Sequence, residues 1–232
     1  MNAVKLMKRT DTKFVFPIST LHKIIPKLIE HYRVLDINGV RLNAYRSLYF
    51  DTEDFLFYHQ HHNGKTNRNK VRFREYIDSG LSFLEVKRKN NKGKTVKKRI
   101  KVNGISITLD GTNKDFVSKV VGSELALKPQ HWNKFNRITF VHKRRKERLT
   151  IDVNFRFEDT QSSKKNLGDM VIAEVKQAKR NLSSDFIRII KKERVHPFRI
   201  SKYCMATASL FPQLKRNNFK RKFLHLDKLH ST

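Results

Sequence analysis

The chain has 232 residues, and its 51 lysines and arginines against 21 acidic residues give a formal charge of +30 at pH 7. Such a surplus favours a polyanionic partner, which could be nucleic acid, an anionic membrane or polyphosphate. A hydrophobic fraction of 38% and 17 phenylalanines argue against a disordered chain. The single cysteine, Cys204, excludes an internal disulfide and a cysteine-built zinc site.

The sequence lacks the signals of membrane insertion and export. No apolar run approaches the ~18 residues of a transmembrane helix, and the first residues contain no hydrophobic core of signal-peptide length. We therefore expect a cytoplasmic protein without an integral membrane segment.

In chain order, helical spacing of apolar residues predicts a helix over 19–32, behind a serine N-cap and kinked at Pro26. The period then changes to two. Strands are predicted near 43–51, 68–77, 81–89, 94–102, 105–109, 134–143, 147–157 and 170–177. The stretch N-N-K-G at 90–93 is typical of a hairpin turn. Shorter helices are predicted near 114–121, 183–193 (capped by Ser183 or Ser184) and 201–211.

Few glycines and prolines interrupt the chain, and no repeat or flexible linker divides it. This pattern indicates a single domain over residues 1–212. The basic tail at 213–232 is expected to be loosely held.

Cations occupy every second position of R-N-K-V-R-F-R-E-Y at 68–76, so a strand places them all on one side. They are Arg68, Lys70, Arg72 and Arg74. The polar faces of the other strands also carry mostly Arg and Lys, with few acidic residues between them, whereas solvent-facing strands usually mix charges. Eight antiparallel strands suffice to close a barrel. We therefore predict an α+β fold, an eight-stranded antiparallel β-barrel with helices packed outside and a cationic tunnel inside.

Such a tunnel suits a row of phosphates, because Arg and Lys bind phosphate oxygens through charge-assisted hydrogen bonds. A carboxylate beside a phosphate is repelled unless a divalent metal bridges the two. The metal-ligand candidates are therefore Glu174, then Glu85, then Asp152, and a salt bridge to a neighbouring cation is the alternative for each. Phosphate-loop, dinucleotide-binding and serine-hydrolase motifs are absent from the sequence. Phosphoryl transfer remains, since it needs mainly positioning and charge neutralisation.

Ten short motifs then point to a known family through their order and spacing. They are R-T-D-T-K-F at 9–14, S-L-Y-F-D-T at 47–52, Y-H-Q-H-H-N-G at 58–64, R-N-K-V-R-F-R-E-Y at 68–76, F-L-E-V-K-R-K at 83–89, K-K-R at 97–99, F-N-R-I-T-F at 135–140, R-L-T-I-D at 148–152, A-E-V-K at 173–176 and S-K-Y at 201–203. Over about residues 6–211 the chain resembles the polyphosphate polymerase domain of the vacuolar transporter chaperone (VTC) type, a branch of the triphosphate tunnel metalloenzymes. The resemblance implies transfer of the ATP γ-phosphate to a growing polyphosphate chain with Mn²⁺ or Mg²⁺.

By position, the resemblance also implies a set of site residues. The phosphate-gripping residues would be Lys13, Arg72, Arg74, Lys87, Arg137 and Lys202, with Glu174 holding the metal and with Lys70, Lys89 and Arg99 as further wall residues. His61 falls where eukaryotic relatives have an arginine, and Phe135 where a tyrosine is expected.

One difference from the sequence motif of the related CYTH branch bears on which reaction is expected. That branch opens with E-x-E-x-K, where this chain has R-T-D-T-K at 9–13, so Arg9 replaces one carboxylate and Asp11 keeps the other. This pattern favours the polymerase over adenylate cyclase or thiamine triphosphatase chemistry.

The sequence leaves three functions open. The first is a polymerase that uses ATP and polyphosphate; coupling to translocation would need a membrane-protein partner. The second is a hydrolase of tripolyphosphate or nucleoside triphosphates in the same tunnel. The third is a nucleic-acid-binding module built from the basic hairpin 81–102 and the tail 213–232. We expect most of the aromatic residues on the apolar faces rather than among the cations, which disfavours base stacking.

Overall fold

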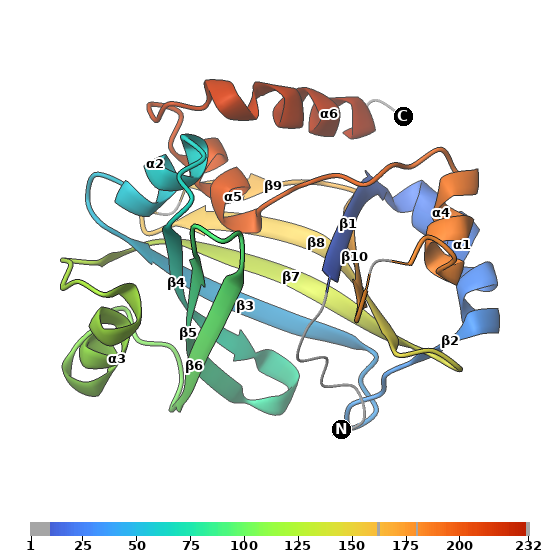
Figure 1. The fold of residues 1–232 in the computed structure, drawn as a ribbon, viewed down its shortest axis with the longest axis horizontal. Helices are drawn as coiled ribbons and strands as arrows, with labels where there is room; N and C mark the ends of the chain where they lie inside the picture. Colours follow the sequence, from blue (N-terminus) through green and yellow to red (C-terminus); the bar gives the residue numbers. More distant parts are fainter. Residues whose placement is uncertain (1–9, 162, 180, 231–232) are drawn as a thin grey trace.

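One curled antiparallel sheet forms the body of the protein (Figure 1). The structure is a computed structural model that describes residues 10–161, 163–179 and 181–230. Its strands are β1 (Thr10–Pro17), β2 (Tyr32–Val34), β3 (Leu42–Asp51), β4 (Arg68–Tyr76), β5 (Leu81–Lys89), β6 (Thr95–Val102), β7 (Lys128–His142), β8 (Glu147–Asp159), β9 (Lys164–Asn166) and β10 (Met170–Gln177).

The main path of the sheet runs β1-β10-β8-β7-β3-β4-β5-β6, while β2 pairs with β7 and β9 with β8. The predicted antiparallel sheet of eight strands with a tunnel-like curl is confirmed. It is a curled sheet rather than a closed barrel, because its edge strands β1 and β6 are not paired with each other in the described ranges. Cations on β6, among them Lys98 and Lys101, blunt that edge, as charged side chains commonly do on edge strands.

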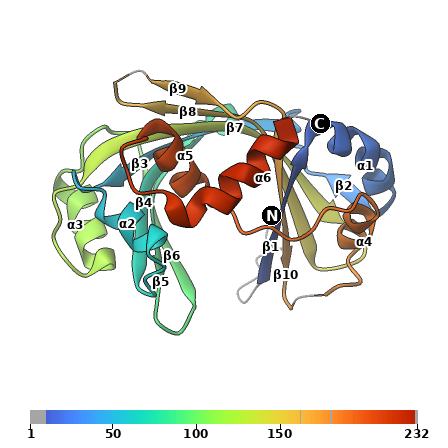
Figure 2. The ribbon, with the colours of Figure 1, turned by 90° about the horizontal axis from the view of Figure 1, so that it is seen from above.

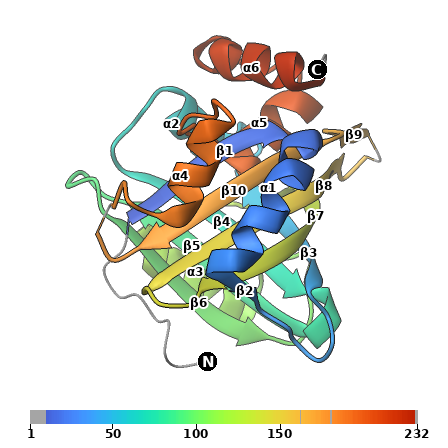
Figure 3. The same cartoon turned by 90° about the vertical axis from the view of Figure 1, so that its right-hand side faces the viewer.

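The helices cover the outside of the curl and one of its ends. They are α1 (Ile18–His31), α2 (Leu56–His62), α3 (Gly111–Val121), α4 (Asp185–Lys192), α5 (Lys202–Leu210) and α6 (Lys220–His230), with short 3₁₀ turns η2 (Ile77–Ser79) and η3 (Asn217–Phe219). Helices α1 and α4 lie on the outer face of the sheet near β10 (Figure 3). The apolar residues of α1, such as Leu21 and Leu28, pack there against Phe140 and Leu149.

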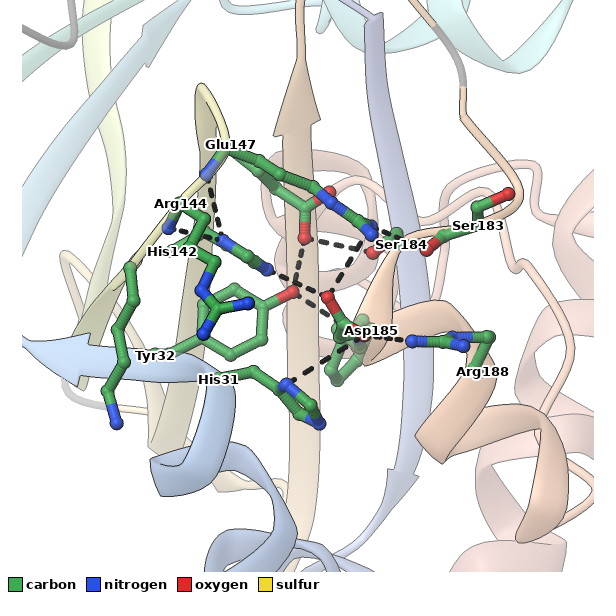
Figure 4. A network of polar contacts seen from close by, with 12 residues as sticks. His31, Tyr32, His142, Arg144, Glu147, Ser183, Ser184, Asp185 and Arg188 are labelled. Carbon is green, nitrogen blue, oxygen red and sulfur yellow. Dashed lines mark hydrogen bonds and ion pairs between the residues drawn. The ribbon is translucent and has the colours of Figure 1, made fainter.

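A buried polar network fixes α4 to the hairpin between β7 and β8 (Figure 4). Asp185 of α4 is bonded to Nε2 of His142 at 2.8 Å. Glu147 accepts hydrogen bonds from Ser184 (2.9 Å), from the amide of Gln177 (2.6 Å) and from the hydroxyl of Tyr32. Because Glu147 begins β8 and Gln177 ends β10, the network holds together the two strands that carry Asp152 and Glu174.

Asp51 joins β3 to two helices near the candidate site. Its carboxylate accepts the backbone N–H groups of Thr52 (2.8 Å), Phe57 (2.8 Å) and Tyr58 (3.0 Å) and the hydroxyl of Tyr203. A carboxylate before the first turn of α2 satisfies donors that have no partner inside the helix. The motif S-L-Y-F-D-T thus positions α2 and α5 relative to the sheet.

Several sequence-based predictions were wrong or incomplete. Residues 105–109 form no strand; Ile105 and Leu109 instead pack a loop onto the core. Pro17 rather than a serine precedes α1, which continues through Pro26. The strands β1, β2 and β9 and the helices α2 and α6 were not predicted. Ser184 does cap α4, accepting the N–H of Ile187 at 3.3 Å.

The basic tail is not loosely held where it is described. Residues 217–230 form η3 and α6, and the side chains of Phe219 and Leu226 are buried. Asn218 is hydrogen-bonded twice to His62 of α2. Apolar residues spaced along the tail therefore dock it onto the domain.

Candidate functional site

The strand register gathers the charged side chains on the inner face of the curl. Arg72 on β4 lies opposite Tyr49 on β3 and Glu85 on β5, and directly opposed residues share a face. On the other side of the curl, Glu174 on β10 lies opposite Lys13 on β1. The charge of Glu174 also acts on Lys87 of β5, although β5 and β10 lie far apart along the sheet path. The two halves of the curl therefore face each other across the inside of the tunnel, here called the bore.

Glu85 is the buried acidic partner of two cations. Its side chain is 0% exposed, and Oε2 accepts from Nε (2.9 Å) and Nη2 (2.6 Å) of Arg72, while Oε1 accepts from Lys97. Burial opposes ionisation of Glu85, but the charges of Arg72, Arg74 and Lys97 outweigh it and leave its pKa below the ordinary value. Glu85 would have to give up one of these ion pairs to bind a metal.

Asp152 plays the same part between the sheet and α5. It accepts from Nη2 of Arg137 at 2.7 Å and from Nζ of Lys202 at 2.5 Å. Burial raises the pKa of Asp152, but these two cations outweigh the burial and hold the pKa below its usual value. Since Lys202 begins α5, this pair fixes the helix over the inner face of the sheet.

Glu174 is less completely paired than the other two. Its Oε2 accepts from Lys176, and no hydrogen bond or ion pair to Oε1 is found among the described residues. Burial opposes its ionisation, yet Lys176 and Lys13 lower the pKa of Glu174 well below the ordinary value. Of the three metal candidates, Glu174 therefore has an oxygen to offer without breaking an ion pair.

A divalent ion at Glu174 would need ligands from outside the protein. Within the described ranges, no group of three or more His, Cys, Asp or Glu side chains could hold a metal. Mg²⁺ is commonly bound by one or two carboxylates together with substrate phosphates. The donor set of this bore fits that arrangement and does not fit a permanent all-protein metal site.

Four inner cations have no carboxylate partner among the described residues. Lys13 donates to the backbone oxygen of Ile200 (3.0 Å), Lys70 to Oγ of Ser201 (2.9 Å) and Arg74 to Oγ of Ser47 (3.2 Å). The Lys87 ammonium has no hydrogen bond or ion pair in the described part of the chain.

Their electrostatic environment is unfavourable without an anion. Burial, and then the charges of Lys13 and Arg72, lower the pKa of Lys70 to about 8. Burial and the charge of Arg72 likewise lower the pKa of Lys87 well below its ordinary value. Burial lowers the pKa of Arg74 too, and Arg72 adds to the effect. An anion in the bore would relieve this repulsion.

Some aromatic residues lie among the cations, although most were expected on the apolar faces. Tyr45 and Phe135 stack on each other at 5.2 Å on the inner face. Arg137 lies 5.1 Å from the ring of Tyr45, and Lys202 lies 4.8 Å from that of Phe135. Both rings are buried, and they hold these cations in place through cation–π contacts. Phe135, which replaces an expected tyrosine, has this supporting position.

The remaining predicted residues lie around the bore's edges. Helix α2 carries His61, whose pKa is lowered to about 2 by burial and then by the charges of Lys70 and Arg68. The charge of Lys89 acts on the same ring. Arg99 is exposed on the edge strand β6, 4.3 Å from the ring of Phe83.

Sequence reasoning did not single out three inner-face residues: Lys97, Lys176 and Ser201. The signal was present for the lysines, because Lys97 alternates with Arg99 and Lys176 with Glu174. Ser201 could not be found in this way, because it lies before α5 and reaches Lys70 only through the tertiary fold.

A curled antiparallel sheet whose inner face joins many cations to a few carboxylates defines a triphosphate-tunnel protein. The VTC domain profile matches residues 8–211, and the chain belongs to this family.

Solved structures of low sequence identity share the fold. One, from Bacillus halodurans, is described as a proposed adenylate cyclase; it is 12% identical, with a TM-score of 0.54 over 88% of this chain and 100% of its own. Another, from Hippeastrum, is described as a proposed adenylyl cyclase with a dominant triphosphatase activity. It is 13% identical, with a TM-score of 0.54 over 88% of this chain and 96% of its own. No curated protein matches the chain.

None of the helices in the described ranges combines the length and the apolar character that crossing a membrane requires.

Proposed function

We propose that the protein is a metal-dependent polyphosphate polymerase that transfers the γ-phosphate of ATP to a growing polyphosphate chain. The observation that carries the proposal is the excess of positive over negative charge in the bore. Lys13, Lys70, Arg74 and Lys87 face it without a carboxylate partner among the described residues, and Glu174 lies across from Lys87 with one carboxylate oxygen to offer. A linear phosphate with a divalent ion supplies the missing charges.

In the proposed step, a terminal oxygen of the polyphosphate chain attacks the γ-phosphorus of ATP. The bond between that phosphorus and the β–γ bridging oxygen breaks, and ADP leaves with the electron pair on its β-phosphate. One phosphoanhydride bond forms as one is lost. The acceptor oxygen is already ionised, so the step needs no general base, only alignment and charge neutralisation.

The residues would divide this work as follows. Lys13, Lys87 and Arg74, which have no acidic partner in the described residues, would bind phosphate oxygens at once. Arg72 and Arg137 are held by Glu85 and Asp152 in fixed orientations, which aim their remaining N–H groups. Lys202 of α5 is likewise held by Asp152 and would bind phosphate from the helix side of the bore. A divalent ion on Glu174, Mn²⁺ or Mg²⁺, would neutralise charge on the transferring group.

Hydrolysis is the second candidate. The Hippeastrum structure that shares the fold is described as having a dominant triphosphatase activity. With water in place of the polyphosphate chain, the same clamp would release orthophosphate and a proton. A nucleic-acid module is less well supported, because the inner aromatic rings are buried under the cations and a base cannot stack on them.

The test is incubation of the purified protein with ATP and Mn²⁺ or Mg²⁺, followed by detection of polymer that exopolyphosphatase degrades. We expect polymer from the wild type and at least 100-fold less from Glu174→Gln. The matched control is Glu124→Gln, which removes an exposed carboxylate paired with Lys114 and should act as the wild type.

Release of orthophosphate from ATP or tripolyphosphate without polymer would support the hydrolase instead. Absence of both reactions, together with DNA or RNA binding that Glu174→Gln leaves unchanged, would reject either enzyme.

A further inference from the structure

Helix α6 lies outside the part of the chain that the family profile matches, since that match ends at residue 211. It nevertheless contacts the strands β1 and β10 and lies across one end of the curl (Figures 1 and 2). The bonds between Asn218 and His62 and the burial of Phe219 and Leu226 hold it there. The segment is therefore placed well enough to contribute side chains to the bore.

Lys222 is the cation of α6 that turns towards the domain. Its side chain is half-buried, and its ammonium lies 4.8 Å from the ring of Phe219. Burial lowers its pKa, and the charges of Arg68 and Lys13 add to this effect. Arg68 and Lys13 belong to β4 and β1, so Lys222 lies close to cations from both sides of the bore.

Unpaired polar atoms lie in the same region. Nε2 of His61 and Nε of Arg68 are buried and have no hydrogen-bond partner among the described residues. The ring of His61 is already bonded to the backbone of Asn69, which leaves Nε2 as its unused atom. Groups of this kind are rare in native interiors, and each needs a partner such as an ion or a water molecule, or a catalytic role, to explain it.

The region is also displaced along the bore from the centre of the inner face. Arg68 and Arg74 lie at the two ends of the alternating row on β4, and a strand rises about 3.3 Å per residue, which separates them by about 20 Å. This span is longer than one triphosphate group. A ligand that touches both ends must therefore be longer than a triphosphate group.

We propose that α6 completes an outer phosphate subsite at this end of the tunnel, formed by Lys222, Arg68, Lys89 and Nε2 of His61. Its ligand is the part of a linear inorganic polyphosphate that extends beyond the three phosphates held further inside. The subsite rests on the proposed binding of linear phosphates in the bore and adds a preference for long chains. His61, neutral in the free protein, takes a proton from solvent when the phosphate arrives and then donates from Nε2.

The test compares the affinities of two probes, tripolyphosphate and a polyphosphate tens of phosphates long, by calorimetry at moderate salt that suppresses non-specific binding. Lys222→Gln should weaken long-chain binding about 3- to 10-fold and leave tripolyphosphate binding unchanged. Arg221→Gln is the matched control, because it removes one exposed charge from the same helix. It should change neither affinity by more than a small, equal factor.

Proton uptake gives an independent readout. Calorimetry of the long chain at pH 7 in buffers of different ionisation enthalpy should show uptake of protons by the wild type and less uptake by His61→Asn. If α6 had only a structural role, His61→Asn would not change the number of protons taken up on binding.

The outcomes separate the two proposals. If the wild type binds both probes and Lys222→Gln behaves as Arg221→Gln, the outer subsite is refuted while binding in the bore stands. If the wild type binds neither probe, the proposed function itself fails.

Discussion

Substitution of Glu85 by Gln tests whether the tunnel is built as a frame of buried ion pairs. The change keeps the shape of the side chain and removes its charge. Both carboxylate oxygens are engaged, by Arg72 and by Lys97, and Glu85 is completely buried. The variant would leave the Arg72 guanidinium buried without a carboxylate, because the amide oxygen of glutamine can accept its N–H groups but carries no charge to balance it.

The size of the effect follows from the burial of each partner. Breaking a buried pair by removal of one member costs about 3–5 kcal/mol. Lys97 is one-third exposed and can turn to solvent, whereas the side chain of Arg72 is 9% exposed and cannot. We therefore expect the low end, about 3 kcal/mol, which for a domain of this size lowers Tm by roughly 6–12 °C.

Thermal denaturation with and without tripolyphosphate is the assay. The anion returns negative charge to the bore, so the difference in Tm between Glu85→Gln and the wild type should shrink as tripolyphosphate is added. Glu124→Gln, at the surface, should follow the wild type throughout. A variant as stable as the wild type without anion, or a difference in Tm that tripolyphosphate does not change while it stabilises the wild type, would show that Glu85 does not balance the buried charge of Arg72.

Other predictions concern pH and helix capping. Burial lowers the pKa of Lys70 and of Lys202 to about 8, below the value near 10.5 of an unfolded chain. The unfolded chain thus binds more protons between these values, so the free energy of unfolding should rise with pH above 8, and calorimetry should show weaker tripolyphosphate binding over the same range. Burial lowers the pKa of His131 to about 4 and that of His61 to about 2. Stability should therefore fall as pH drops below 6.5, by up to about 1.4 kcal/mol per pH unit for each histidine, and urea titrations of His131→Gln should show a flatter profile. Ser184→Ala removes the cap of α4 and the bond to Glu147, and should cost about 1–2 kcal/mol in the same titrations without changing tripolyphosphate affinity.

The alternation of charged and apolar residues made the sheet predictable from sequence. In β4, every second residue from Arg68 to Arg74 is a cation, and the pleat of the strand places all of them on the inner face because the opposite face is buried. The hairpin of β5 and β6 followed from the turn at 90–93 for the same local reason.

Tertiary contacts determined what the sequence did not reveal. Helix α2 is short and depends on Asp51, which lies at the end of β3. The tail reads as a charged extension, yet Phe219 and Leu226 find burial against segments far away in the chain. The pairing of Asp152 with both a strand and a helix likewise depends on how the sheet curls.

A crystal structure with tripolyphosphate and Mn²⁺ would show whether linear phosphates bind in the bore beside a metal at Glu174, because the anomalous signal locates the ion. We expect phosphates in the bore against Lys13, Arg74 and Lys87, with manganese bound by the carboxylate of Glu174 and by phosphate oxygens. Phosphates bound only on the outer surface, or manganese far from Glu174, would contradict it.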